Sequence, residues 1–228
     1  MNDLTGFRNF RSFQGIRTKN GRTLRAGVFA RSDNPHALPE EDMILLREAD
    51  YRIVVDLRRD EERAARPDLL AAAPGFEYHP LTLNSKPYLG RYLLSDSKMV
   101  ARAYFSELPA AAAPLRKIFH LFAEAENGVL FHCEAGKDRT GVVAALLLTL
   151  VGAEEAEIID DYAASLDRLY GEGADVFLAD RELIPKAEVM EYFLDFFYAK
   201  YISSESFFAG IGLSESDREM IKRKFVSR

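Results

Sequence analysis

The chain has 228 residues, of which 48% are hydrophobic and 29% are charged, and its formal net charge at pH 7 is −6. This length fits one sizeable domain, residues 1–228, and the composition excludes a disordered, fibrous or disulfide-stapled protein. The negative charge argues against a general binder of nucleic acid or of anionic membranes, because such partners call for a clustered basic surface.

The cysteine content and the apolar runs indicate the cellular compartment in which we expect the protein. Cys133 is the single cysteine, so it cannot form an intrachain disulfide and fits a reducing environment. The first ten residues lack the apolar segment of a secretory signal, and the longest apolar run, 142–151, is far shorter than the roughly 20 residues that cross a bilayer. We expect a cytoplasmic protein without stable membrane insertion. Export by a route that needs no cleaved signal stays open.

The first predicted element is a hairpin near the amino terminus. Residues 19–22 read Lys-Asn-Gly-Arg, which is typical of a tight turn because Asn20 and Gly21 are suited to positive φ. We therefore expect two short strands, one on each side of this turn.

Strands and helices alternate along the rest of the chain. Apolar or β-branched runs predict strands over 51–57, 76–83 and 128–131. Helical patterns predict helices over 39–48, 98–105, 114–126 and 141–151, and helix throughout 154–228. This alternation favours an α/β fold.

The residues with chemical potential stand between the 128–131 strand and the 141–151 helix. They read His132-Cys133-Glu134-Ala135-Gly136-Lys137-Asp138-Arg139-Thr140-Gly141. The nucleophilic form of cysteine is the thiolate, which needs an electropositive setting, and a helix N-terminus and nearby cations provide one. We therefore expect Cys133 to be a catalytic nucleophile. A buried, inert cysteine is the alternative, but it does not explain the neighbouring glycines and arginine.

The segment after Cys133 has the composition of an anion-binding loop. Its backbone N–H groups can turn inward around a phosphate, and Gly136 permits a φ that most residues resist. The Arg139 guanidinium can hold two phosphate oxygens, and Thr140 can donate to the sulfur when it departs. The predicted phosphate-binding residues are Glu134, Ala135, Gly136, Lys137, Asp138, Arg139 and Thr140.

These residues carry a resemblance to a known family. Cys133 to Arg139 matches the Cys-x5-Arg phosphate loop of the protein tyrosine phosphatases, and the Gly-Lys-Asp-Arg-Thr-Gly ending resembles their atypical bacterial branch of tyrosine, dual-specificity and lipid phosphatases. Further matches occur in order along nearly the whole chain: Asn9-Phe10-Arg11 before Gly15, Arg31-Ser32, Asp56-Leu57-Arg58 with Glu61-Glu62-Arg63, Asp161-Tyr162, and Gly212-Leu213-Ser214. Ser12, where the branch has an acidic residue, and residues 34–36 depart from the pattern.

The resemblance implies a fold, a reaction and partners. The fold would be a central, mostly parallel sheet flanked by helices. The reaction would be hydrolysis of phosphotyrosine through a cysteinyl-phosphate, without a metal or other cofactor, and with phosphoserine, phosphothreonine and phosphoinositides as further substrates. The partners would be a phosphorylated protein or a phosphoinositide, and inorganic phosphate as product. The resemblance also implies a helical lid within 166–201, where the aromatic side chains could instead pack in the core.

Two aspartates are candidates for the general acid that protonates the leaving oxygen. The chain has no Trp, so the Trp-Pro-Asp loop of many tyrosine phosphatases is absent in that form. The resemblance assigns the role to Asp138. Asp56 ends a predicted strand and could approach Cys133 from a neighbouring strand of a parallel sheet. We favour Asp138, and the alternative for Asp56 is a charge that holds Arg139 or the loop in place.

We expect His132 to orient the loop from a second layer, and Lys137 is either a substrate-facing cation or a solvated charge. The remaining histidines, His36, His79 and His120, have no spacing that indicates a metal site. A catalytically silent phosphate-binding module and a rhodanese-like sulfurtransferase are the alternative functions. The set of cysteine, arginine and acid disfavours the first, and the Lys-Asp-Arg-Thr-Gly ending disfavours the second.

Overall fold

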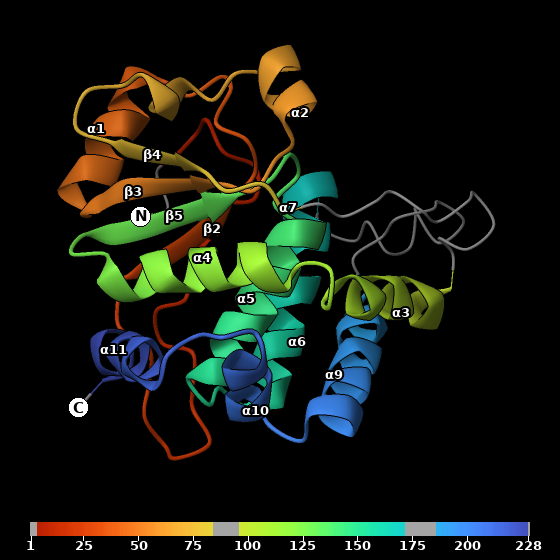
Figure 1. The fold of residues 1–228 in the computed structure, drawn as a ribbon. Coiled ribbons are helices and arrows are strands. Elements are labelled where there is room, and N and C mark those ends of the chain that lie inside the picture. Colours follow the sequence, from red (N-terminus) through yellow and green to blue (C-terminus); the bar gives the residue numbers. More distant parts are fainter. Residues whose placement is uncertain (1–3, 84–95, 172–185, 228) are drawn as a thin grey trace.

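The computed structural model describes residues 4–83, 96–171 and 186–227, and its described part is built around a five-stranded sheet (Figure 1). In spatial order the strands are β1 (Arg11–Ser12), β2 (Phe29–Ser32), β5 (Gly128–His132), β3 (Tyr51–Asp56) and β4 (Glu77–Pro80). The last four are parallel to one another, and β1 is antiparallel to β2. The expectation of a mostly parallel sheet flanked by helices is confirmed.

The register of the strands brings the site together. His132 at the end of β5 pairs with Ser32 of β2 on one side and with Asp56 of β3 on the other. The carboxyl ends of three parallel strands therefore meet at one edge, where ligands bind in open α/β sheets. The central strand β5 is buried along its whole length, which explains its run of apolar residues.

Helices cover both faces of the sheet (Figure 1). On one face, α1 (Glu40–Glu48) and the short η1 (Leu69–Ala71) pack with the amino-terminal segment over a small core. On the other face, a larger core is formed with α4 (Ala112–Glu124), α5 (Asp138–Leu150) and α11 (Glu215–Phe225). Every residue of α5 from Thr140 to Leu150 is buried, as its uniformly apolar sequence predicts.

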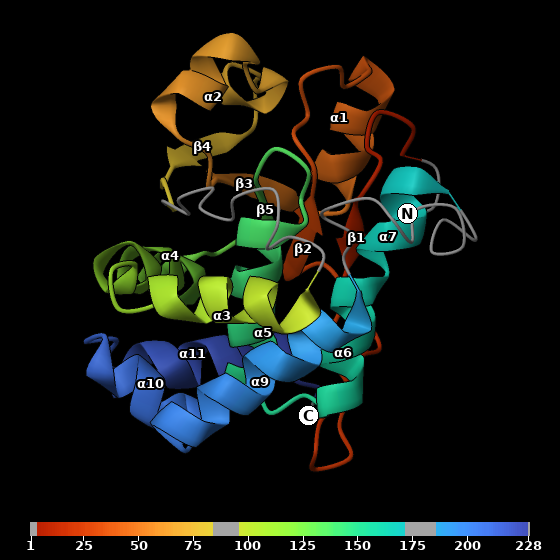
Figure 2. The same cartoon turned by 90° about the vertical axis from the view of Figure 1, so that its right-hand side faces the viewer.

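The remaining helices lie around this core and beside the site. Their bounds are α2 (Asp60–Ala65), α3 (Ser97–Glu107), α6 (Glu155–Ala163), α7 (Ser165–Tyr170), α9 (Ala187–Tyr201) and α10 (Ser204–Gly210). Figure 2 shows α3 and α9 side by side. Among the described residues, no helix has the length and apolar character that crossing a membrane requires.

The predicted lid segment is only partly described. Phe193 and Phe197 of α9 are fully buried in the larger core, as the packing alternative expects. Residues 172–185 lie outside the described residues, so the lid stays a prediction.

The predicted turn is present, but the hairpin differs from the expectation. The Gly21 N–H donates to the Thr18 carbonyl at 2.9 Å, and Gly21 has a φ of 78°. The expectation of positive φ at Asn20 is wrong. Its side-chain oxygen accepts a hydrogen bond from the Thr18 hydroxyl at 2.6 Å. The arms are joined by backbone hydrogen bonds, from the Thr18 N–H to the Arg22 carbonyl at 2.8 Å and from the Leu24 N–H to the Ile16 carbonyl at 2.9 Å, around an isolated bridge between Arg17 and Thr23. They are not strands of the five-stranded sheet.

Candidate active site

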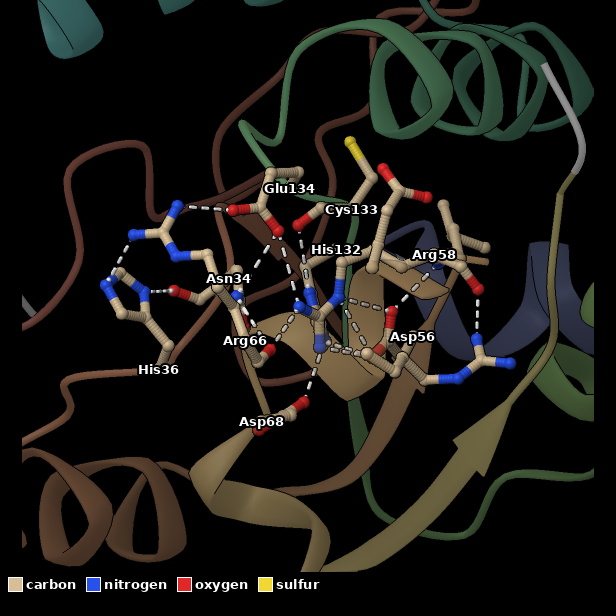
Figure 3. Close-up of polar contacts among 12 residues, drawn as sticks. Asn34, His36, Asp56, Arg58, Arg66, Asp68, His132, Cys133 and Glu134 are labelled. Carbon is tan, nitrogen blue, oxygen red and sulfur yellow. Dashed lines mark hydrogen bonds and ion pairs between the residues drawn. The ribbon is translucent and has the colours of Figure 1, made fainter. Parts of the chain in front are cut away.

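Residues 133–137 form the loop between β5 and α5, so Cys133 stands directly after the buried strand. The Cys133 side chain is almost fully buried. Its sulfur points away from the charged cluster of Asp56, Arg58 and Asp68 behind the loop (Figure 3). Because α5 starts where this loop ends, the positive end of its helix dipole faces the loop.

Two carbonyls of the 133–137 loop are held by the amino-terminal part of the chain. The backbone N–H of Asn34 donates to the Glu134 carbonyl at 3.0 Å. The side-chain amide of Asn9 donates to the Ala135 carbonyl, also at 3.0 Å. Both donors lie outside the loop, so these two carbonyls point outward.

The next two carbonyls are held by Arg31 of β2. Its Nη2 donates to the Gly136 carbonyl at 2.6 Å and lies 3.4 Å from the Lys137 carbonyl. The buried Arg31 guanidinium is balanced by Asp161 of α6, which accepts from Arg31 Nη1 and from Arg11 Nε. Burial would raise the pKa of Asp161, but these two guanidiniums lower it, so the carboxylate stays ionised.

The outward carbonyls fix the direction of the loop's N–H groups. The C=O and N–H of one planar peptide unit point in opposite directions, so the N–H groups of residues 135–138 face the inner side of the loop. The Cys133 carbonyl lies 3.1 Å from His132 Nδ1, which directs the Glu134 N–H in the same way. The loop therefore has the geometry that the sequence predicts for an anion cradle.

Gly136 is required by both its conformation and its surroundings. Its φ is 67°, a left-handed value that L side chains rarely adopt. A Cβ at this position would lie 2.3 Å from the carbonyl oxygen of Ser32. The close approach of loop and strand β2 is therefore possible only with glycine.

Arg139 is paired with a residue to which the sequence analysis gave no such role. Its Nη1 and Nη2 donate to the two carboxylate oxygens of Glu62 in α2, at 2.7 and 2.6 Å. Burial would raise the pKa of Glu62, but the hydrogen bonds from Arg139 lower it to about 2. The Glu61-Glu62-Arg63 match was the only sequence signal, and it did not indicate the partner.

This pair leaves one edge of the Arg139 guanidinium open for a ligand. Nη1 also faces the Leu57 carbonyl, at 3.5 Å. A guanidinium has five N–H donors, and the contacts with described residues use both of those on Nη1 and one on Nη2. The Nε–H and the second Nη2–H lie together on the other edge, which matches two oxygens of a phosphate.

Asp56 lies behind the loop and holds Arg58, not Arg139. The Arg58 guanidinium donates to both Asp56 oxygens at 2.7–3.1 Å, and the Tyr78 hydroxyl donates to Oδ2 at 2.7 Å. Burial alone would raise the pKa of Asp56, but Arg58 and then the charge of His132 lower it to about 2. A fully buried carboxylate in this setting has no proton to give, so the geometry favours the positioning alternative.

Asp138 is the more accessible of the two candidate acids. Its side chain, in the first turn of α5, is 36% exposed. Oδ1 accepts a hydrogen bond from the Tyr104 hydroxyl of α3 and lies 3.5 Å from Lys137 Nζ. The Lys137 side chain is only 6% exposed, which contradicts its interpretation as a solvated loop charge.

His132 connects the loop to the buried charges behind it. Its Nε2 lies 2.9 Å from an Asp68 oxygen, and its Nδ1 faces the Cys133 carbonyl. Both neighbours are acceptors, an arrangement that favours a proton on each ring nitrogen. Burial disfavours the positive charge of this form, but the Asp68 hydrogen bond and the Asp56 charge outweigh it and raise the pKa of His132.

The side chain of Glu134 places a carboxylate beside the loop. The sequence predicted only that the backbone N–H of this residue binds phosphate. The carboxylate oxygens pair with Arg66 at 2.5 Å and with Arg58 at 3.3 Å (Figure 3). The two guanidiniums neutralise this charge next to the cradle. The Thr140 hydroxyl is buried and makes no hydrogen bond with any described residue.

Two clusters of described residues have donor atoms close enough for a metal ion. In the first, Asp56, Asp68 and His132 are already engaged with Arg58, Tyr78 and each other, so their geometry does not fit a metal. The second, His120 and Glu124 of α4 with Asp217 of α11, lies at the surface and lacked a sequence signal because Asp217 is remote in the chain.

The Asp56–Arg58 pair predicts how the stability depends on pH. The folded-state pKa of Asp56, about 2, is below its ordinary value of 3.8. The contribution of ionised Asp56 to the free energy of unfolding is therefore present above pH 4 and is lost as the pH falls through 2. That contribution is about 2 kcal/mol. Asp56→Asn should lower the free energy of unfolding at neutral pH by roughly 3–5 kcal/mol, because the buried Arg58 loses its partner.

Chemical denaturation between pH 2 and pH 7 measures both effects. The Asp56→Asn protein should also show a shallower loss of stability between pH 4 and 2 than the wild type. Asp60→Asn is the matched control, because the Asp60 side chain is 91% exposed and its surface pair contributes little. Equal stability of Asp56→Asn and Asp60→Asn at neutral pH would contradict this account.

Comparisons with known proteins find tyrosine phosphatases that are similar to this chain. A curated tyrosine-protein phosphatase of Nostoc commune is 36% identical over 155 residues, which are 67% of this chain and 53% of that protein. Triple specificity protein phosphatase PtpB of Mycobacterium tuberculosis is 30% identical over 201 residues, 72% of this chain and 69% of that protein. A solved structure of P. aeruginosa TpbA in complex with pTyr is 21% identical and covers 74% of this chain and 85% of its own, with a TM-score of 0.34, too low to compare the two sites.

The chain spans about half the length of the Nostoc relative. The model of the tyrosine phosphatase family, by contrast, matches residues 2–227, which is almost the whole sequence. This chain therefore belongs to the tyrosine phosphatase family.

Proposed function

We propose that this protein hydrolyses phosphate monoesters, phosphotyrosine in particular, through a phosphocysteine intermediate on Cys133. The observation that carries the proposal is the outward anchoring of the 134–137 carbonyls, which directs the N–H groups of the loop toward one anion. The open edge of Arg139 supplies the cation for that anion. Membership in the tyrosine phosphatase family supports the choice of phosphate as the anion.

The first half of the reaction forms the phosphoenzyme. The loop N–H groups and Arg139 hold three phosphate oxygens, and the Cys133 thiolate attacks phosphorus. The S–P bond forms while the P–O bond to the leaving group breaks. Asp138 gives its proton to that leaving oxygen and becomes a carboxylate.

The second half releases the product. The Asp138 carboxylate takes a proton from a water molecule, whose oxygen attacks phosphorus from the side that the leaving group vacated. The S–P bond breaks, the Cys133 thiolate is restored and inorganic phosphate departs. The buried hydroxyl of Thr140, which makes no hydrogen bond with any described residue, is available to donate to the departing sulfur.

The substrate range follows from the loop and its surroundings. Phosphotyrosine needs only the cradle and Arg139, and we extend the range to phosphoserine, phosphothreonine and phosphoinositides. The buried ammonium of Lys137, next to Asp138, is a second cation for substrates with more than one phosphate. The "triple specificity" in the name of the mycobacterial relative is consistent with a broad range. We propose that the chain acts as one domain, without a metal, in the cytoplasm.

Replacement of the nucleophile tests the proposal. Cys133→Ser should reduce turnover of p-nitrophenyl phosphate, measured with a chelator present, by at least about 10³-fold, because serine is a much weaker nucleophile at neutral pH. Phosphate binding, measured by calorimetry, should persist because the cradle is intact. Arg139→Ala should lose both turnover and binding. Turnover by Cys133→Ser close to that of the wild type would rule out the covalent mechanism.

Leaving-group chemistry tests the assignment of the acid. Nitrophenolate departs well as an anion, whereas the serine alkoxide needs a proton. Asp138→Asn should therefore suppress phosphoserine turnover by ~10²–10⁴-fold and affect p-nitrophenyl phosphate much less. Asp56→Asn, which disturbs the buried contacts of Arg58 and Tyr78 behind the loop, should affect both substrates alike. The reverse pattern in these two variants would move the acid to Asp56.

A further inference from the structure

The contacts of the Asp138 carboxyl group are one-sided. Oδ1 accepts from the Tyr104 hydroxyl and is the oxygen nearest to Lys137 Nζ. No described residue donates to Oδ2, and the Asp138 side chain is 36% exposed. The two oxygens of this carboxyl group are therefore not equivalent before substrate arrives.

The Tyr104 hydroxyl is itself held in place by a second tyrosine. The Tyr162 hydroxyl of α6 lies 3.1 Å from that of Tyr104, and the two rings meet edge to face. Each hydroxyl has one proton. Because the proton of Tyr104 is donated to Asp138, Tyr162 is the donor between the two tyrosines. Burial and the Asp138 charge raise the pKa values of both tyrosines, so both stay protonated.

Gly141 makes the space that this arrangement needs. A Cβ at position 141 would lie 2.9 Å from the ring of Tyr162. The last glycine of the Gly-Lys-Asp-Arg-Thr-Gly sequence therefore allows Tyr162 to pack against α5. The helices α5, α6 and α3 therefore meet at the Asp138 carboxyl group, through Gly141, Tyr162 and Tyr104 respectively.

We propose that Tyr104 is a positioning residue that fixes the side chain of Asp138 and places its acidic proton on Oδ2. A carboxyl oxygen that already accepts from a hydroxyl, with an ammonium nearby, is the poorer site for the proton. The proton therefore resides on Oδ2, to which no described residue donates, and it can be transferred from there to a leaving oxygen. The Tyr104 hydrogen bond to Oδ1 is compatible with both the acid and the carboxylate, so it persists through the catalytic cycle. The proposal rests on the proposed role of Asp138 as general acid.

Removal of the Tyr104 hydroxyl should weaken the acid while leaving the nucleophile intact. Tyr104→Phe keeps the ring and its packing, so the fold should be retained. Turnover of phosphoserine should fall by about 10- to 100-fold, as expected for the loss of one hydrogen bond to a charged group. Turnover of p-nitrophenyl phosphate should change by less than about threefold, because its leaving group needs little protonation.

A double-mutant cycle separates positioning from a general structural effect. In the Asp138→Asn background, Tyr104→Phe should cause no further loss on phosphoserine, because the group that it positions is already gone. Tyr192→Phe is the matched control: it removes a tyrosine hydroxyl from α9, which packs beside α3, and should leave both activities unchanged.

The outcomes distinguish this inference from the proposed function. If Asp138→Asn shows the leaving-group dependence and Tyr104→Phe does not, Tyr104 has no positioning role and the acid assignment stands. If Tyr104→Phe reduces both substrates equally, or its effect adds fully to that of Asp138→Asn, its role is structural and the inference is overturned. If Asp138→Asn lacks the leaving-group dependence, the acid assignment fails, and the inference fails with it.

Discussion

The site depends on one constraint: the backbone carbonyls that follow Cys133 must point away from the thiol. A planar peptide leaves no other way to present a row of N–H groups to an anion. Each of these carbonyls is anchored, those of Gly136 and Lys137 both by Arg31, and the anchors Asn9, Arg31, Asn34 and His132 come from three separate parts of the chain. The cradle is therefore a product of the whole fold rather than of the loop sequence alone.

The cations of the site are fixed before any substrate arrives. Arg139 is held by Glu62, and Arg31 by Asp161, in each case by a carboxylate whose pKa its partners lower. A guanidinium that is already oriented needs no reorganisation when charge develops on the phosphate, and this is the condition under which electrostatic stabilisation is most effective. The carboxylates also reduce the cost of burying these charges close to one another.

The strand, loop and helix around Cys133 could be predicted from the sequence because their signals are local: an apolar run, a glycine and a buried helix adjoin one another. The partners of these residues could not. Glu62 and Arg139 are 77 positions apart in the sequence, and Tyr104 and Asp138 are 34 positions apart. Hydrophobic periodicity does not predict contacts between residues that are so far apart. The structural alternative for Asp56 named Arg139 or the loop as its partner, whereas its carboxylate pairs with Arg58. Its actual partner, Arg58, lies two residues away, a distance at which many carboxylates have no contact.

A crystal structure of the protein with bound orthovanadate or phosphate would test the central claim most directly. The account predicts anion oxygens within about 3 Å of the N–H groups of residues 134–138 and of the Nε–Nη2 edge of Arg139. The Arg139–Glu62 pair and the outward carbonyls of residues 133–137 should be unchanged. An anion bound elsewhere, or a carbonyl of the loop turned toward the Cys133 sulfur, would contradict the account.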